Sequence, residues 1–489
     1  MSAVAAAAAV VAASCTPPPA VAPTFIGSSS KPSYVLGESG ALVEPIISVG
    51  DSVNARPDGS PYRFVGIPDG AGVLDNGNGT FTVFVNHELT GSAGIVRAHG
   101  AKGAFISKWV VRKGTYEVLS GEDLLTGVAL YDSATGSWAA KASGIVLSRF
   151  CSADLPAVSA FYDAATGTGT TERIFMAGEE VGAEGRAFAN VVTGPEAGTA
   201  FELPWLGKFS WENALANPGT GTSTVVVGTD DTTPGQVYVY TGTKTNDPNP
   251  VVAAGLTNGT LGGIAVAGLL TENDATTLAG PTPFTVPDLG DVESKTGAQL
   301  QTDSVAAGIT QFNRPEDASW DVNDPNTLYF VTTASITGVS RIWKITFVDA
   351  SNPSLGGTAE ILFSGPAYDA SKSAAEQAGP RMMDNITTTA GGDILIQEDP
   401  GNSAYLAGIW QFDVSTKKIR RVGVHAPAFF TQAPATFITQ DEESSGIVPL
   451  DVIGEPGKYL FVDQVHKANP DAELVEFGQM NLLEVDDLS

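Results

Sequence analysis

Six times along the chain, a short apolar run is followed by polar residues, and most of these runs are preceded by a turn. The apolar runs begin at residues 83, 174, 225, 328, 394 and 459. A turn before a short apolar run is typical of a buried β-strand. Units of one kind at irregular spacing favour a radial repeat that carries long insertions. The sequence therefore predicts an all-β fold, a six-bladed β-propeller with long loop insertions, in which each run is the inner strand of a blade.

Most of the apolar runs end in acidic residues. The six polar ends are Asn86-His87-Glu88, Glu179-Glu180, Asp230-Asp231, Thr332-Thr333, Gln397-Glu398-Asp399 and Asp463-Gln464. Because the inner strands of a propeller surround one channel, we expect these ends to gather on one rim. Carboxylates a few Å apart repel one another, so a convergent cluster requires cations at its centre. The alternative is that acids at strand ends only keep the sheet edges soluble and monomeric.

The charge balance restricts the partners. Lys and Arg number 26 and Asp and Glu 54, which gives a formal net charge of −28. This charge argues against nucleic acid or an anionic membrane surface as the main partner. It fits an exported protein, a saline environment or a carrier of cations. We expect a monomer with no integral membrane span.

The first 24 residues predict a leader or tether, ahead of a single propeller domain over residues 25–489. The Ala-rich run Ala3–Ser14 has the length of a signal-peptide core and is too short to span a bilayer. It ends in Ala-Ala-Ser-Cys15, a loose match to a lipoprotein processing site. We therefore expect export to the periplasm, the cell surface or the medium, with a lipid anchor at Cys15 as one route. The alternative is a low-complexity tail without a role.

Cys151 is the second of only two cysteines, so processing at Cys15 would leave it unpaired. An odd cysteine in an exported protein is a candidate ligand or reactive thiol. A lone buried cysteine that acts as a small apolar residue is the alternative. Arg314 is a candidate for phosphate binding because its planar fork matches phosphate oxygens. An ordinary ion pair with Glu316 is the alternative there. The sequence contains no P-loop, GxSxG, HExxH or paired CxxC motif.

Five short segments, in this order, resemble motifs of the PhoX-type alkaline phosphatases, over roughly residues 80–489. They are Phe150-Cys151-Ser152, Gly178-Glu179-Glu180, Leu206–Ala214, Gly228–Asp231 and Arg314–Asp317. The resemblance implies a six-bladed propeller with iron and calcium on its axis, which hydrolyses phosphomonoesters outside the cytoplasm.

Carried over residue by residue, the resemblance implies that Cys151 and one of Glu179 and Glu180 hold iron. It implies further that Glu212, Asp231 and Glu316 hold iron or calcium. Arg314 would clamp the phosphate, and Arg314, Glu316 and Glu212 are the catalytic candidates. The chain departs from the family pattern at Phe150, Trp211 and Asp317, which stand where the family has asparagine, a basic residue and glycine.

The leading hypothesis is an exported metal-dependent phosphoesterase of the alkaline phosphatase kind, acting on a small phosphorylated substrate. Cations would neutralise phosphate oxygens and activate water, so no side-chain nucleophile is needed. Two alternatives stay open. One is a non-catalytic surface propeller that binds calcium. The other is a calcium-dependent lactonase or phosphotriesterase, whose axial cage needs no cysteine.

Overall fold

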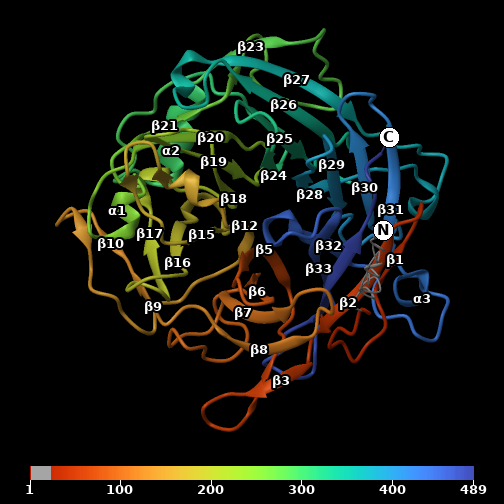
Figure 1. Ribbon diagram of the computed structural model, residues 1–489. Coiled ribbons are helices and arrows are strands. Elements are labelled where there is room, and N and C mark those ends of the chain that lie inside the picture. The colour runs from red at the N-terminus through yellow and green to blue at the C-terminus, as the bar shows by residue number, and fades with distance from the viewer. Residues whose placement is uncertain (2–23, 489) are drawn as a thin grey trace.

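The computed structural model describes residue 1 and residues 24–488, in which six β-sheets surround one axis (Figure 1). The prediction of an all-β, six-bladed propeller is confirmed. The expected leader, including Cys15, falls on residues 2–23, which lie outside the described residues. Within the described part of the chain, no helix has both the length and the apolar character needed to cross a membrane.

We number the blades in chain order and give the strands of each from the axis outward. Blade 1 contains β5 (Pro68–Asp75), β6 (Thr80–His87), β7 (Phe105–Arg112) and β8 (Val118–Asp123). Blade 2 contains β12 (Phe150–Asp154), β15 (Ile174–Glu179), β16 (Ala187–Val191), β17 (Thr199–Glu202) and β9 (Gly127–Ala129). Blade 3 contains β18 (Trp211–Ala216), β19 (Ser223–Asp230), β20 (Val237–Thr243) and β21 (Thr260–Gly263).

The second half of the ring is built in the same way. Blade 4 contains β24 (Pro315–Trp320), β25 (Thr327–Thr332), β26 (Arg341–Phe347), β27 (Gly357–Ser364), β23 (Thr282–Thr285) and β22 (Ala265–Val266). Blade 5 contains β28 (Met383–Thr388), β29 (Asp393–Glu398), β30 (Gly408–Asp413), β31 (Ile419–His425) and β1 (Val35–Gly37). Blade 6 contains β32 (Glu442–Pro449), β33 (Lys458–Val465), β34 (Phe477–Glu484) and β2 (Leu42–Ser48).

Insertions between the strands carry the remaining elements. Three small hairpins pair β3 (Ser52–Ala55) with β4 (Pro61–Arg63), β10 (Tyr131–Asp132) with β11 (Ser137–Trp138), and β13 (Tyr162–Asp163) with β14 (Thr168–Gly169). The helices of the described residues are short: α1 (Pro250–Ala253), α2 (Gly297–Ala306) and α3 (Pro427–Phe430). The expectation of long loop insertions is thus met.

The assignment of the apolar runs to the inner strands is wrong by one strand. The runs form the second strand of each blade, namely β6, β15, β19, β25, β29 and β33. The strands nearest the axis are those that precede them, and each lies beside the inner strands of the two adjoining blades. A second strand is covered on both faces by neighbouring blades and is therefore apolar throughout. An inner strand lines the channel, so its polar residues hide it from a search for apolar runs.

The apolar core consists of six main clusters, one between each pair of adjoining blades. The N-terminal segment closes the ring, because β1 pairs with β31 at the edge of blade 5 and β2 pairs with β34 in blade 6. The chain then enters blade 1 through β5. In Figure 1 the red N-terminal strands lie beside the blue strands of the last blades.

We expect the packing of β2 to carry much of the stability of this closure. Ile47 is 0% exposed in the cluster between blades 6 and 1, and Ile47→Ala should cost about 2–5 kcal/mol of unfolding free energy. Leu42 on the same strand is 60% exposed, so Leu42→Ala should change that free energy by less than about 0.5 kcal/mol. Urea unfolding measures both variants. Equal midpoints for the two would contradict this account of the closure.

Candidate metal centre

All six inner strands begin at the same rim of the channel, and the second residue of each is an acid or a cysteine. We call these six residues the inner ring: Asp69, Cys151, Glu212, Glu316, Asp384 and Glu443. The start of each inner strand pairs with the end of the second strand, as Phe150 pairs with Glu179. The polar ends noticed in the sequence therefore lie on this same rim.

A β-bulge accompanies the inner-ring residue in five of the six blades. In blades 1 to 5 the pairing of inner and second strands shifts directly after the first residue of the inner strand. In blade 6 the shift comes later, between Ser445 and Val448. A bulge inserts an unpaired residue and re-aims side chains, and bulges are common beside functional sites.

A second set of residues lies around the inner ring. We call it the outer ring, and it consists of the residue directly after each second strand: Glu88, Glu180, Asp231, Thr333, Asp399 and His466. In every blade its backbone N–H donates a hydrogen bond of 2.8 to 3.0 Å to the residue before the inner strand. Those acceptor residues are Ile67, Arg149, Ser210, Arg314, Met382 and Asp441. One backbone construction thus repeats in all six blades, and only the side chains on it differ.

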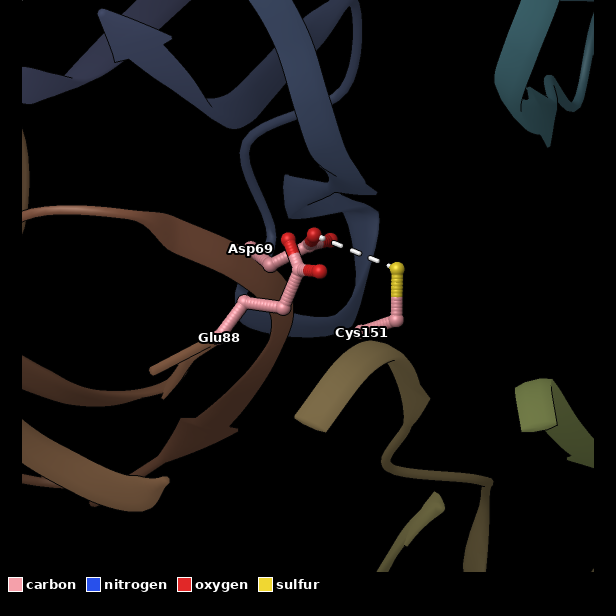
Figure 2. Close-up of side chains that lie close together, drawn as sticks. All are labelled: Asp69, Glu88 and Cys151. Carbon is pink, nitrogen blue, oxygen red and sulfur yellow. Dashed lines mark hydrogen bonds between the residues drawn. The ribbon is translucent and has the colours of Figure 1, made fainter. Parts of the chain in front are cut away.

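Two groups of ligand-type side chains converge on the rim. Asp69, Glu88 and Cys151 each present one ligand atom, and these atoms lie within 4.8 Å of one another (Figure 2). Glu212, Glu316 and Asp384 form the second group within the same limit. In the first group the Cys151 thiol donates to Asp69 Oδ2 over 3.4 Å. Each group therefore has the spacing that a single cation requires.

The electrostatics of both groups are unfavourable for bare carboxylates. Burial, and then the charge of Glu88, raises the pKa of Asp69 well above its usual value. Burial, and then the charge of Asp231, does the same to the pKa of Glu316. Burial raises the pKa of Glu212 to about 8 although Cys151 and Ser152 donate hydrogen bonds to it. Without a positive partner, these acids would hold protons at neutral pH.

The donor atoms fit divalent cations. Buried Asp69 Oδ1 has no hydrogen-bond partner among the described residues. Burial, and then the charge of Asp69, raises the pKa of the Cys151 thiol well above its usual value. A metal reverses this preference, since it binds the thiolate and releases the proton. Carboxylate oxygens suit hard cations such as calcium, whereas a thiolate biases one position towards a transition metal such as iron.

Two arginines are set among the acids. Arg314 donates to both oxygens of Asp231, over 2.8 Å from Nε and 3.0 Å from Nη2, and its Nη2 lies 2.7 Å from Glu316 Oε1. Arg149 Nη2 lies 2.6 Å from Glu88 Oε1 and also contacts the Glu180 carboxylate. The rim thus presents guanidinium groups beside the acids.

A hydrogen-bonded layer lies directly behind the inner ring. Its members are the third residues of the inner strands. Ser152 Oγ donates to Glu212 Oε1 over 2.6 Å, and Asn385 Nδ2 donates to Ser152 Oγ over 2.6 Å. Asn213 Nδ2 donates over 2.6 Å to Asp317, whose other oxygen accepts from the Ile386 backbone. Asp317, which departs from the family pattern, therefore ties blade 4 to blades 3 and 5.

Blade 6 completes the rim with a different arrangement. Gln464 Nε2 donates to Asp69 Oδ2 over 2.8 Å and to Glu443 Oε1 over 3.1 Å. His466 lies between Glu443 and Glu476, with its Nδ1 2.8 Å from Glu476 Oε2. Burial opposes the charged imidazole, but hydrogen bonds to the two carboxylates outweigh it and raise the pKa of His466 to about 11. The two carboxylates therefore favour the charged form of this histidine.

The structure brings most of the site residues predicted from sequence to the rim. Cys151, Glu212 and Glu316 belong to the inner ring, and Glu180 and Asp231 to the outer ring, where Arg149 and Arg314 contact them. Glu179 lies apart from both groups of ligand-type residues.

Glu179 is held by a basic residue outside the channel. Arg186 donates to both of its carboxylate oxygens, over 2.6 and 2.8 Å, and the Ser148 backbone donates over 3.0 Å. Successive side chains of a strand point to opposite faces, so only one of two adjacent glutamates can face the axis. Here that residue is Glu180.

Sequence reasoning missed half of the inner ring: Asp69, Asp384 and Glu443. A usable signal exists one strand upstream of each apolar run. It is a triplet in which an acid or cysteine precedes a small or polar residue, as in Pro68-Asp69-Gly70 and Met383-Asp384-Asn385. Such triplets are common in any acidic chain, and only the repeat distance to the following run singles them out.

Comparison with known proteins finds solved structures that resemble this chain. Pseudomonas fluorescens PhoX in complex with vanadate, a transition-state analogue, aligns with a TM-score of 0.67 and 13% sequence identity over 94% of this chain and 98% of that chain. A protein assigned as a 6-phosphogluconolactonase from Bacteroides uniformis aligns with a TM-score of only 0.38 and 12% identity, over 88% of this chain and 94% of that chain. No protein-family model and no curated protein matches the sequence. The chain therefore shares the fold of PhoX over nearly its whole length, at a sequence identity that speaks for the fold alone.

Proposed function

We propose that the protein is an exported, metal-dependent phosphoesterase that hydrolyses phosphomonoesters at the rim of its central channel. The observation that carries the proposal is the inner ring, in which all six blades place an acid or a cysteine at one equivalent position beside two arginines. A fold needs no such ring, because buried carboxylates destabilise it unless something positive binds there.

Each group of ligand-type residues would hold a cation. Asp69, Glu88 and Cys151 would hold a transition metal such as iron, because one donor is a thiol. Glu212, Glu316 and Asp384 offer only oxygen atoms and would hold calcium. When bound, such cations supply Lewis-acid chemistry, which neutralises phosphate oxygens and activates water without a side-chain nucleophile.

Arg314 would bind the phosphate group of the substrate. Its guanidinium is one quarter exposed and faces the acids of the second group, with paired N–H donors directed at Asp231. If Glu316 were bound to a cation, the Arg314 guanidinium would have one carboxylate fewer beside it and could bind an anion. A planar fork then binds two phosphate oxygens at once and stabilises the charge that develops on them. In the layer behind the inner ring, Ser152 donates to Glu212 and Asn385 donates to Ser152, and these hydrogen bonds would keep Glu212 in one orientation.

A substrate panel tests the proposed function. Purified protein, loaded with calcium and iron, would be assayed against p-nitrophenyl phosphate, a phosphodiester, a phosphotriester and a lactone. We expect turnover of the monoester to exceed that of the others by orders of magnitude. Binding of calcium without any turnover would support a non-catalytic surface propeller instead. Turnover of the triester or lactone alone would support the calcium-dependent hydrolase.

The variant Arg314→Lys tests the role of the guanidinium fork. Lysine keeps the positive charge but loses the paired planar donors, so we expect KM for the monoester to rise about tenfold. The melting temperature should stay within a few degrees, because the ion pairs to Asp231 and Glu316 can be re-formed by an ammonium group. Steady-state kinetics and a thermal melt measure both. Unchanged kinetics would remove Arg314 from the binding site.

A further inference from the structure

Arg149 occupies in blade 2 the place that Arg314 occupies in blade 4. Each residue directly precedes its inner strand and stands two positions before an inner-ring residue, Cys151 or Glu316. Both adopt left-handed backbone conformations, with φ of 46° and 60°. The backbone carbonyl of each accepts the same hydrogen bond from the outer ring of its own blade. The two arginines are therefore equivalent by the repeat of the fold.

Each of the two side chains also reaches the outer-ring acid of the preceding blade. Arg314 reaches Asp231, the outer-ring acid of the preceding blade 3, and Arg149 reaches Glu88, the outer-ring acid of the preceding blade 1. Each also contacts one acid of its own blade. The Arg149 guanidinium therefore lies between acids of blades 1 and 2, and the Arg314 guanidinium lies between acids of blades 3 and 4.

The backbone does not require arginine at this position. Ile67 and Met382 adopt the same left-handed conformation in blades 1 and 5. The conformation belongs to the construction of the blade, whereas a positive charge at this position is peculiar to blades 2 and 4. Arg149 is also open to solvent, with 40% of its side chain exposed against 25% for Arg314. An anion in the channel can therefore reach the Arg149 guanidinium from solvent.

We propose that Arg149 is a second phosphate-binding arginine, and that Arg149 and Arg314 together form a clamp that selects phosphomonoesters over phosphodiesters. The inference rests on the proposed function of the same site. A monoester presents three non-ester oxygens, enough to meet cations and two planar forks together. A diester presents only two, and its second ester group occupies the position of the third, so the contacts to that oxygen are lost. Paired charge-assisted donors of this kind are among the strongest hydrogen bonds in proteins.

The test compares two substitutions of Arg149 with matched changes at Arg112. Arg149→Lys keeps the charge without the fork. Arg149→Asn removes both and suits a left-handed backbone, which asparagine adopts readily. Arg112 is likewise exposed and paired, with its Nε 3.0 Å from Glu117, and it lies at the end of β7 away from the inner strands. Metal content, thermal melts, calorimetric binding of inorganic phosphate, and kcat/KM for p-nitrophenyl phosphate and its bis-ester are measured for all variants.

We expect Arg149→Asn to weaken phosphate binding about tenfold or more and to lower the monoester-to-diester ratio of kcat/KM, with metal content unchanged. Arg149→Lys should bind phosphate more tightly than Arg149→Asn does, but its monoester-to-diester ratio of kcat/KM should stay low. The Arg112 variants should behave as wild type. The inference is overturned if phosphate affinity and the ratio do not change. It is overturned too if phosphate affinity and the ratio fall only as far as the metal content falls. Arg149 would then serve only to neutralise the neighbouring acids. These outcomes leave the proposed function intact, whereas a wild-type protein that neither binds phosphate nor hydrolyses the monoester would defeat both.

Discussion

Treatment of the protein with a chelator is expected to abolish phosphatase activity and to lower its melting temperature by about 10 °C. A ligand that binds only the folded state stabilises it by mass action, by about 2.7 kcal/mol when its free concentration is 100 times Kd. Two cations would together contribute roughly 5 kcal/mol, and in a chain of this length each kcal/mol shifts the melting temperature by about 2 °C. Melts with and without chelator, paired with elemental analysis, measure the effect.

The pH dependence of the same melts gives a sharper version of this test. Burial raises the pKa of Glu212 from 4.5 to about 8 in the metal-free folded state. Between pH 4.5 and pH 8 this carboxyl keeps its proton in the folded chain but has lost it in the unfolded chain. Its contribution to the unfolding free energy is therefore fully present below pH 4.5 and is lost as the pH rises towards 8. One such carboxyl lowers the unfolding free energy by about 1.4 kcal/mol for each pH unit in this range.

The chelated protein should therefore lose more melting temperature between pH 5 and pH 8 than the metal-loaded protein does. Asp317, whose pKa burial raises to about 6, belongs to neither ligand group and should contribute equally to both. Restoring calcium should reduce the slope as well as raise the melting temperature. A protein that contains no metal as purified, and whose melting ignores both chelator and added calcium, would contradict the whole account of the rim.

The repeat could be predicted from sequence because the second strands are packed between blades on both faces. Their unbroken apolar character, as in β15 and β19, gave the number of blades and the fold class. The inner strands could not be found in the same way. They line the channel with polar side chains, and a strand such as β28, with the sequence MDNITT, has no periodic apolar signal. The prediction therefore selected the right blades and the wrong strand within each.

The site was predictable only in part, for a related reason. Cys151, Glu212 and Glu316 stood in segments that resemble family motifs, and they do lie in the inner ring. Asp69 and Asp384 stand in short polar stretches, and what makes them ring members is the register of the bulged strand. Register is a property of pairing between strands, and it cannot be read from the residues of one strand alone.

Cys151→Ser is expected to cost about 100-fold in kcat and to remove the transition metal while calcium stays bound. Serine matches the thiol in size but keeps its proton at neutral pH and offers a hard oxygen, so the group formed with Asp69 and Glu88 loses the donor that favours a softer ion. Changing a residue that only supports a metal ligand typically lowers metal affinity or activity about 10- to 100-fold. Loss of a direct ligand should therefore lower kcat by an amount at the upper end of this range or beyond it.

Two comparisons make the result for Cys151 specific. Cys15→Ser removes the other cysteine of the chain and should change neither metal content nor kcat. Elemental analysis of the serine variant at Cys151 should show iron reduced and calcium retained, because the oxygen-only group of Glu212, Glu316 and Asp384 is untouched. If both metals and kcat match those of the wild type, then the thiol, 3.4 Å from Asp69, is only a half-buried hydrogen-bond donor. The rim would then bind hard cations alone, a composition that favours the calcium-dependent alternatives over a mixed iron and calcium phosphatase.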